Sequence, residues 1–320
     1  MAVYTHVEEE ELEVFLQDYD LGDIQSFKGI AEGVQNTNYL LNTSKGSYIL
    51  TLYERGTDKA ELPFFLNLMS HLSDKGIACP IPIKTTGGEE LGELSGRPAA
   101  LVSFLNGVSV GRPTARHCAE VGRGLAKMHN AVIDFPDERA NSLAHEGWRA
   151  LAETYLHATE EVEPGLASII TKELDYLDDH WPQGLPSGVI HADLFPDNVF
   201  FLDSNLSGLI DFYFACNDTF MYDLAICMNA WCFERDGSFN ATKARRLTNA
   251  YGVERPYTEA EVAALPILAR GAALRFLLTR IYDLVNQVEG AVVHTKDPLE
   301  YAKKLRFHQR VKNAGEYGLI

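Results

Sequence analysis

The chain has 320 residues, enough for one large domain or two closely packed ones with a sizeable core. Its 28 basic and 45 acidic residues give a net charge of −17, which argues against nucleic acid or an anionic membrane as a partner. The acidity fits a cationic or zwitterionic small substrate better. No apolar run of membrane-spanning length is free of charges, so we expect a globular protein.

The five cysteines indicate a reducing compartment. They stand at positions 79, 118, 216, 227 and 232 and form no C-x-x-C pair. The first residues do not have the pattern of a secretory signal peptide. We therefore expect free thiols in a cytoplasmic protein.

The first third of the chain has a mixed pattern. Thr5 to Glu8 has the form of a capping box, which predicts a helix directly after it. Between residues 24 and 53, short apolar strands alternate with turn residues, as is typical of a β-meander. A helix over 62–73 and an apolar strand over 98–105 follow.

The remainder of the chain is predicted to be mostly helical. Apolar periodicity and capping residues indicate helices over 114–132, 148–159, 166–181, 219–233, 240–251 and 260–285. The composition changes near Leu105, so we predict an α+β fold with two lobes, 1–105 and 106–320. The small lobe contains an antiparallel sheet and the large lobe is mainly helical.

Two strand-like runs within 189–201 enclose a polar loop that carries candidate catalytic residues. The loop presents His191, Asp193 and Asn198 at the spacing H-x-D-x-x-x-x-N, and Asp211 stands at the start of a later turn. A kinase uses such residues to orient the attacking hydroxyl and to hold metal ions against the nucleotide phosphates. An ordinary hairpin turn is the alternative, since Asp, Asn and Pro favour turns. The coincidence of four residue types, their spacing and the flanking strands favours a phosphoryl-transfer site.

The sequence resembles the aminoglycoside-phosphotransferase/choline-kinase-like family, which has a protein-kinase-like fold, over nearly its whole length. The resemblance rests on residues 191–198, 208–215 and 222–225. The runs Phe212–Ala215 and Asn229–Cys232 are similar to the homoserine-kinase branch of that family.

The resemblance implies an ATP-dependent enzyme that uses Mg²⁺. Asp193 would orient and deprotonate the acceptor hydroxyl, with His191 bracing the loop rather than reacting. Asn198 and Asp211 would hold the metal. Asp223 matches a family position that supports the catalytic loop.

The resemblance places the nucleotide mainly on the first lobe. Gly29 and Gly33 would lie in the turn that covers the phosphates, and the linker residues Ser103, Phe104 and Leu105 would lie beside adenine. A plain hairpin and the last strand of a sheet are the respective alternatives.

Thr51 departs from the kinase pattern. It stands in the strand where kinases usually carry a phosphate-binding lysine. Arg55 and Lys59, just beyond it, are candidates to supply the missing positive charge.

The acceptor implied by the resemblance is the side-chain hydroxyl of L-homoserine, in threonine biosynthesis. Arg270 and Arg275 lie in an apolar helix, so each needs an anionic partner, either an internal carboxylate or that of the substrate. Tyr213 and Trp231 are further substrate candidates. Choline, an aminoglycoside or another amino alcohol is an alternative acceptor, with aromatic faces for a cation. A nucleotide-binding regulator without turnover is the alternative of another class.

Overall fold

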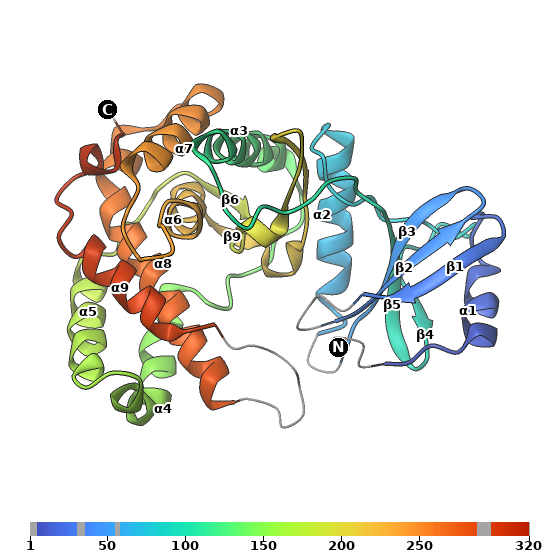
Figure 1. Ribbon diagram of the computed structural model, residues 1–320, viewed down its shortest axis with the longest axis horizontal. Coiled ribbons are helices and arrows are strands. Elements are labelled where there is room, and N and C mark those ends of the chain that lie inside the picture. Colours follow the sequence, from blue (N-terminus) through green and yellow to red (C-terminus); the bar gives the residue numbers. More distant parts are fainter. Residues whose placement is uncertain (1–4, 31–35, 55–57, 287–295, 320) are drawn as a thin grey trace. The chain divides into compact units, whose positions relative to one another are not determined.

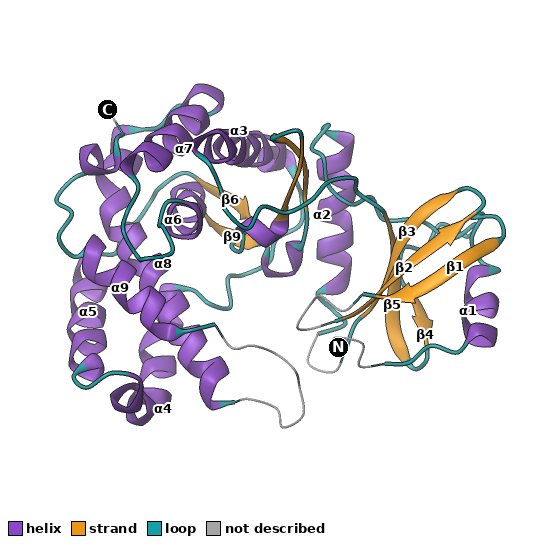
Figure 2. Cartoon of the chain, viewed as in Figure 1, coloured by secondary structure: helices purple, strands orange, loops and turns teal. Residues whose placement is uncertain are grey.

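The computed structural model describes residues 5–30, 36–54, 58–286 and 296–319. The described residues up to Asn106 form one compact unit, and those from Gly107 onward form a second, larger one. Figure 2 shows that strands dominate the first unit and helices the second.

The first unit is built on a single antiparallel sheet in the order β1-β2-β3-β5-β4. Its strands are β1 (Ile24–Gly29), β2 (Thr37–Thr43), β3 (Gly46–Leu52), β4 (Gly92–Leu94) and β5 (Arg97–Ser103). Alternate side chains of β2 are buried, whereas the middle of β5 is buried on both faces. The helices of this unit are α1 (Glu9–Leu16) and α2 (Leu62–Asp74). The predicted meander is therefore confirmed.

The predicted capping box at the start of the chain is wrong. The residue that caps α1 is Glu8, and no side chain caps the helix there. The Thr5 hydroxyl donates instead to Glu54, 2.6 Å away, and its backbone N–H donates to Thr37. Thr5 thus ties the N-terminal segment to the sheet, because two long-range acceptors compete successfully with a local cap.

The second unit is mainly helical (Figure 1). Its helices are α3 (Ala115–Ala131), α4 (His145–Val162), α5 (Leu166–His180), α6 (Phe220–Trp231), α7 (Ala241–Glu254), α8 (Glu259–Val285) and α9 (Pro298–His308). Sequence periodicity predicted all of these except α9. Thr114 caps α3 as expected, accepting from the backbone N–H of His117. Helices α3 and α7 lie side by side in Figure 1 and are in close contact.

Two short antiparallel pairs of strands interrupt the helices. Strand β6 (Ser187–Ile190) pairs with β9 (Cys216–Thr219), and β7 (Val199–Leu202) pairs with β8 (Asn205–Leu209). The loops that join these strands carry the polar motif found in the sequence. The fold prediction, a mixed unit with an antiparallel sheet followed by a mainly helical unit, is confirmed.

Helix α8 is the central apolar helix of the second unit. Among the described residues it is the one helix long and apolar enough to cross a membrane, but most of its apolar stretch is buried inside the unit. Contacts with α4, α5, α6 and α9 account for that burial. Its composition is therefore that of a core helix. All five cysteine thiols are buried and free, as predicted.

Candidate active site

The catalytic loop begins where β6 ends. His191 follows Ile190 directly, Asp193 comes two residues later, and Asn198 closes a short 3-10 turn that leads into β7. Ala192 has a φ of 62° and Asp211, just after β8, a φ of 65°. Left-handed backbone at residues other than glycine costs about 1–3 kcal/mol and is concentrated at functional sites. The surrounding contacts must therefore hold both turns in place.

His191 braces this loop from inside. Its side chain is fully buried, and its Nδ1 accepts from the backbone N–H of Asp193 at 3.3 Å. Nε2 must then carry the proton, which it donates to the carbonyl oxygen of Ile210 at 3.0 Å. Burial lowers the pKa of His191, which keeps the ring neutral. The ring thus links the loop to the segment before Asp211, which fits the bracing role.

Asp193 is held in a defined orientation. The Asn198 side-chain amide donates to the backbone carbonyl of Asp193 at 2.8 Å and to its carboxylate at 3.2 Å. Desolvation raises the pKa of Asp193 to about 7, against the positive charge of Arg275, which lowers it. The negative charge of Asp211 raises it further. A fixed carboxylate that gains and loses a proton near neutral pH has the properties of a general base.

Asn198 and Asp211 have the chemistry of magnesium ligands. Because the Asn198 nitrogen donates to Asp193, its carboxamide oxygen points elsewhere. The Asp211 side chain is exposed, although nearby protein removes enough water to raise its pKa. In the described parts of the chain, no group of three or more His, Cys, Asp or Glu side chains is arranged so that it could hold a metal ion by itself. Mg²⁺ needs only one or two protein oxygens when phosphates and water complete its shell, so the donor set fits.

Asp223, in the first turn of α6, supports the loop from behind. Its buried carboxylate accepts from the backbone N–H groups of His191 and Ala192 at 2.7 and 3.0 Å, and from Nε2 of His129 at 3.1 Å. Burial alone would raise the pKa of Asp223, but these donors outweigh it and the pKa is lowered. His129 also accepts from the Tyr251 hydroxyl at 2.7 Å. Sequence patterns could not identify His129 and Tyr251 as partners of this loop, because they lie on α3 and α7, far from it along the chain.

Trp231 and Arg270 are occupied by internal contacts. Trp231 is 1% exposed and its indole N–H donates to the Leu194 carbonyl at 2.7 Å. Arg270 forms a two-pronged ion pair with the buried Glu173, at 2.6 and 2.7 Å. Of the two partners expected for Arg270, an internal carboxylate or that of the substrate, the structure shows the internal one. Neither side chain is available to a substrate in this arrangement.

Tyr213 and Arg275 lie closer to the loop chemistry. Tyr213 is half-buried and stands two residues after Asp211. Arg275 is buried, and its Nη1 donates to the carbonyl of Ala192 at 2.8 Å. Arg275 therefore lies beside Asp193 and Tyr213 beside Asp211, and their assignment to the substrate stays a prediction.

The predicted nucleotide residues all belong to the first unit. Thr51 is 4% exposed, and its hydroxyl donates to Asn38 on the neighbouring strand at 2.8 Å, so it does not replace the missing lysine. Ser103 is tied to Ile81 by two hydrogen bonds, whereas Phe104 is exposed.

The remaining nucleotide candidates differ in position and exposure. Gly29 ends β1 and Leu105 is half-buried beyond β5. Lys59 is exposed, and Gly33 and Arg55 lie outside the described residues. The assignment of these positions to nucleotide binding stays a prediction.

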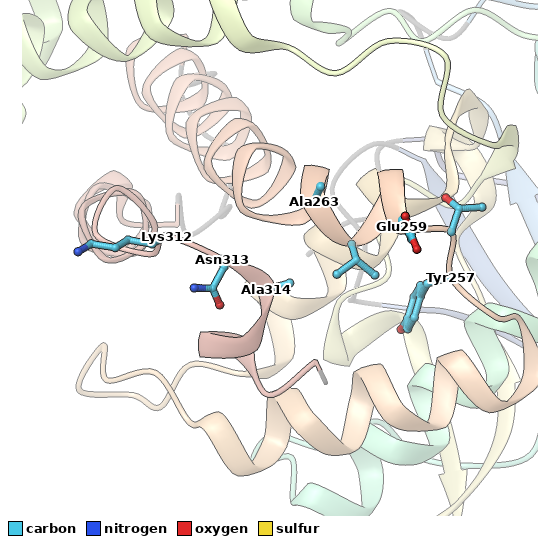
Figure 3. Close-up of a pocket in the computed structure, with 8 residues that line it drawn as sticks. Tyr257, Glu259, Ala263, Lys312, Asn313 and Ala314 are labelled. Atoms are coloured by element: carbon cyan, nitrogen blue, oxygen red, sulfur yellow. The ribbon is translucent and has the colours of Figure 1, made fainter.

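The pocket in Figure 3 is separate from this site. Tyr257, Glu259, Ala263, Lys312, Asn313 and Ala314 are among the residues that line it. They come from the start of α8, the residues before it and the C-terminal segment. None of them belongs to the catalytic loop, so we assign the pocket no part in the chemistry.

The comparisons with known proteins agree with this geometry. The phosphotransferase enzyme family matches residues 26–257. Homoserine kinase of Xanthobacter autotrophicus is 60% identical, with 100% of this chain and 99% of that protein covered. That of Parvibaculum lavamentivorans is 59% identical over the same shares. Among solved structures, an amicoumacin kinase in complex with AMP-PNP and Ca²⁺ has a TM-score of 0.70 at 16% identity, covering 94% of this chain and 92% of its own.

Proposed function

Because the chain belongs to the phosphotransferase enzyme family, we propose that it is an ATP-dependent homoserine kinase. It transfers the γ-phosphoryl group of ATP to the side-chain hydroxyl of L-homoserine, and so serves threonine biosynthesis. The relatives named homoserine kinase support this acceptor, because the similarity extends over the whole of both chains. A cytoplasmic location stays a prediction.

The observation that carries the proposal is the arrangement of Asp193, Asn198 and Asp211. Asn198 fixes the Asp193 carboxylate, and Asp211 is near enough for its charge to raise the Asp193 pKa. A module that only binds nucleotide has no use for a positioned base of this kind. The arrangement therefore favours an enzyme over a regulator without turnover.

Each of these residues has a specific task in the transfer. Asp193 accepts a hydrogen bond from the acceptor hydroxyl, aligns its oxygen and takes its proton as the new bond forms. Asn198 and His191 keep the Asp193 carboxylate and backbone in place. Asp223 accepts hydrogen bonds from two backbone N–H groups of the loop and so maintains the strained turn at Ala192.

Asn198 and Asp211 are the residues that would hold Mg²⁺. A metal ion held there would supply positive charge against the nucleotide phosphates. The role of both residues is to present oxygen donors from two adjacent turns that the strand pairs fix.

Choline is a weaker acceptor candidate in this site. A quaternary ammonium is bound by aromatic faces, and the predicted aromatic face of Trp231 is buried against the loop. Choline also has no carboxylate with which to satisfy a buried arginine. An amino acid therefore suits the surroundings of Asp193 better.

The test is ADP release measured with L-homoserine, L-serine, choline, an aminoglycoside and no acceptor. We expect turnover of L-homoserine and none of choline. The L-serine hydroxyl stops one methylene short, and a misplacement of about 1 Å can cost about 10²-fold. Choline turnover above that of homoserine at equal concentration would contradict the acceptor, and no ADP release with any of them would contradict the enzyme.

A further inference from the structure

Arg275 is the charged side chain nearest to the catalytic loop whose charge has no local explanation. It comes from the middle of α8 and is 5% exposed. Nη1 donates to the carbonyl of Ala192, the residue directly before Asp193. Its guanidinium group therefore lies next to the backbone that positions the base.

The positive charge of Arg275 has no anionic partner among the residues that the structure describes. No carboxylate of those residues forms an ion pair with it, and its hydrogen bond to Ala192 is to a neutral carbonyl. Arg270, one turn earlier on the same helix, forms two hydrogen bonds with the carboxylate of Glu173. Burying a charged group without an anionic partner is costly, so the contrast between the two arginines calls for an anion beside Arg275.

The groups around Arg275 do not supply that anion. Its guanidinium carbon lies 4.2 Å from the centroid of the Phe276 ring and 5.9 Å from that of Phe214. The charge of Arg275 lowers the pKa values of Tyr222 and Tyr301, but burial raises them more, so both hydroxyls stay neutral. Aromatic faces stabilise a guanidinium only partly.

Arg275 lowers the pKa of the nearby carboxylate Asp193, but the two side chains form no ion pair. Arg275 thus lies near the catalytic loop without forming an ion pair with the proposed base, Asp193. Four of the five N–H donors of the guanidinium remain after the bond to Ala192. A planar carboxylate can accept two of them side by side.

We propose that Arg275 binds the carboxylate of the acceptor and thereby makes the enzyme selective for an amino acid over the amino alcohol that lacks this group. The proposal rests on the proposed function and deepens it. Ala192 links the two ends of the acceptor site, since its carbonyl fixes Arg275 and the next residue is the base.

The experiment compares kcat/KM for L-homoserine with kcat/KM for 3-aminopropan-1-ol, which is homoserine without its carboxylate. The variants are Arg275→Met, which keeps the apolar stem, and Arg275→Lys, which keeps the charge. Arg270→Lys is the matched control on the same helix. The ratio of the two kcat/KM values does not depend on how much of a preparation is folded, so a partly unstable variant still gives an answer.

We expect the wild-type chain to prefer homoserine by about 10²-fold or more, the scale of a buried, hydrogen-bonded charge pair. Arg275→Met should remove most of that preference, because activity on homoserine should fall much further than activity on the amino alcohol. Any loss that acts through the pKa of Asp193 affects both substrates and cancels in the ratio. Arg275→Lys should keep an intermediate ratio, and Arg270→Lys the wild-type ratio. Equal losses on both substrates in Arg275→Met would reduce Arg275 to a loop support and overturn the proposal. No homoserine turnover by the wild-type chain would contradict the proposed function itself.

Discussion

Asp193 depends on its neighbours for both position and charge. Asn198 donates to its carboxylate and to its backbone carbonyl, and the His191 ring accepts from its backbone N–H. Burial and Asp211 favour the protonated form, whereas Arg275 favours the charged one. The balance near pH 7 suits a group that must take a proton from an alcohol and release it again.

Replacing this base tests its role directly. Asp193→Asn keeps the size of the side chain but removes its capacity to accept a proton. We expect kcat to fall by about 10²–10⁴-fold, the usual contribution of a general base. The KM for ATP should change little, because Asp193 is not among the residues proposed to hold the metal. Steady-state kinetics with L-homoserine measure both quantities, and a variant as fast as the wild type would exclude Asp193 as the base.

Among the elements, helices α3 and α7 pack so closely that their backbones are in contact. Gly122 of α3 lies against the backbone of Leu247 on α7, and a Cβ at Gly122 would come within 2.1 Å of the Leu247 carbonyl oxygen. A backbone atom cannot move aside as the end of a side chain can. These two helices carry His129 and Tyr251, so their separation also sets the support behind Asp223.

Gly122→Ala should therefore destabilise the protein although alanine favours helix. Overpacking costs about 1–3 kcal/mol, which exceeds the gain of up to about 1 kcal/mol in helix propensity. Gly147→Ala, in α4, is the matched control, because a Cβ there meets nothing within 4 Å. Urea unfolding should show a lower midpoint for Gly122→Ala and an equal or higher one for Gly147→Ala. The same response in both variants would mean that the two helices can move apart freely.

The same elements show how far sequence alone can lead. The loop motif was found because residue type, spacing and flanking strands are all local features, and the placements of His191, Asp193 and Asn198 agree with it. The partners of Arg270, Trp231 and Thr51 depend on contacts between distant segments, so periodicity could show only that each needed a partner. Helix α9 was missed because its short sequence has little apolar periodicity.

Within the second unit, several buried neutral histidines link segments that are distant in the sequence. His308 illustrates this: its Nε2 donates to Asn229 at 2.9 Å, and the Tyr317 hydroxyl donates to its Nδ1 at 2.7 Å. Burial, reinforced by the charges of Lys304 and Arg270, lowers the pKa of His308 to about 3. Burial also lowers the pKa values of His129 and His191.

The sign of the resulting pH effect follows from proton binding. In the unfolded chain a histidine has a pKa of about 6.5, so between that value and about 3 the unfolded state holds a proton at position 308 that the folded state lacks. The stabilising contribution is complete above pH 6.5 and is lost as the pH falls. Each such histidine contributes a slope of up to about 1.4 kcal/mol per pH unit in that range.

We therefore expect the free energy of unfolding, measured in urea, to fall steeply between pH 6.5 and pH 5. In His308→Gln that slope should be shallower by about 1.4 kcal/mol per pH unit, even if the variant is less stable at pH 7.5. His157→Gln is the control, because His157 is exposed and meets water in the folded as in the unfolded chain. A slope that His308→Gln leaves unchanged would show that the folded protein admits a proton to this site, and that the acid sensitivity arises elsewhere.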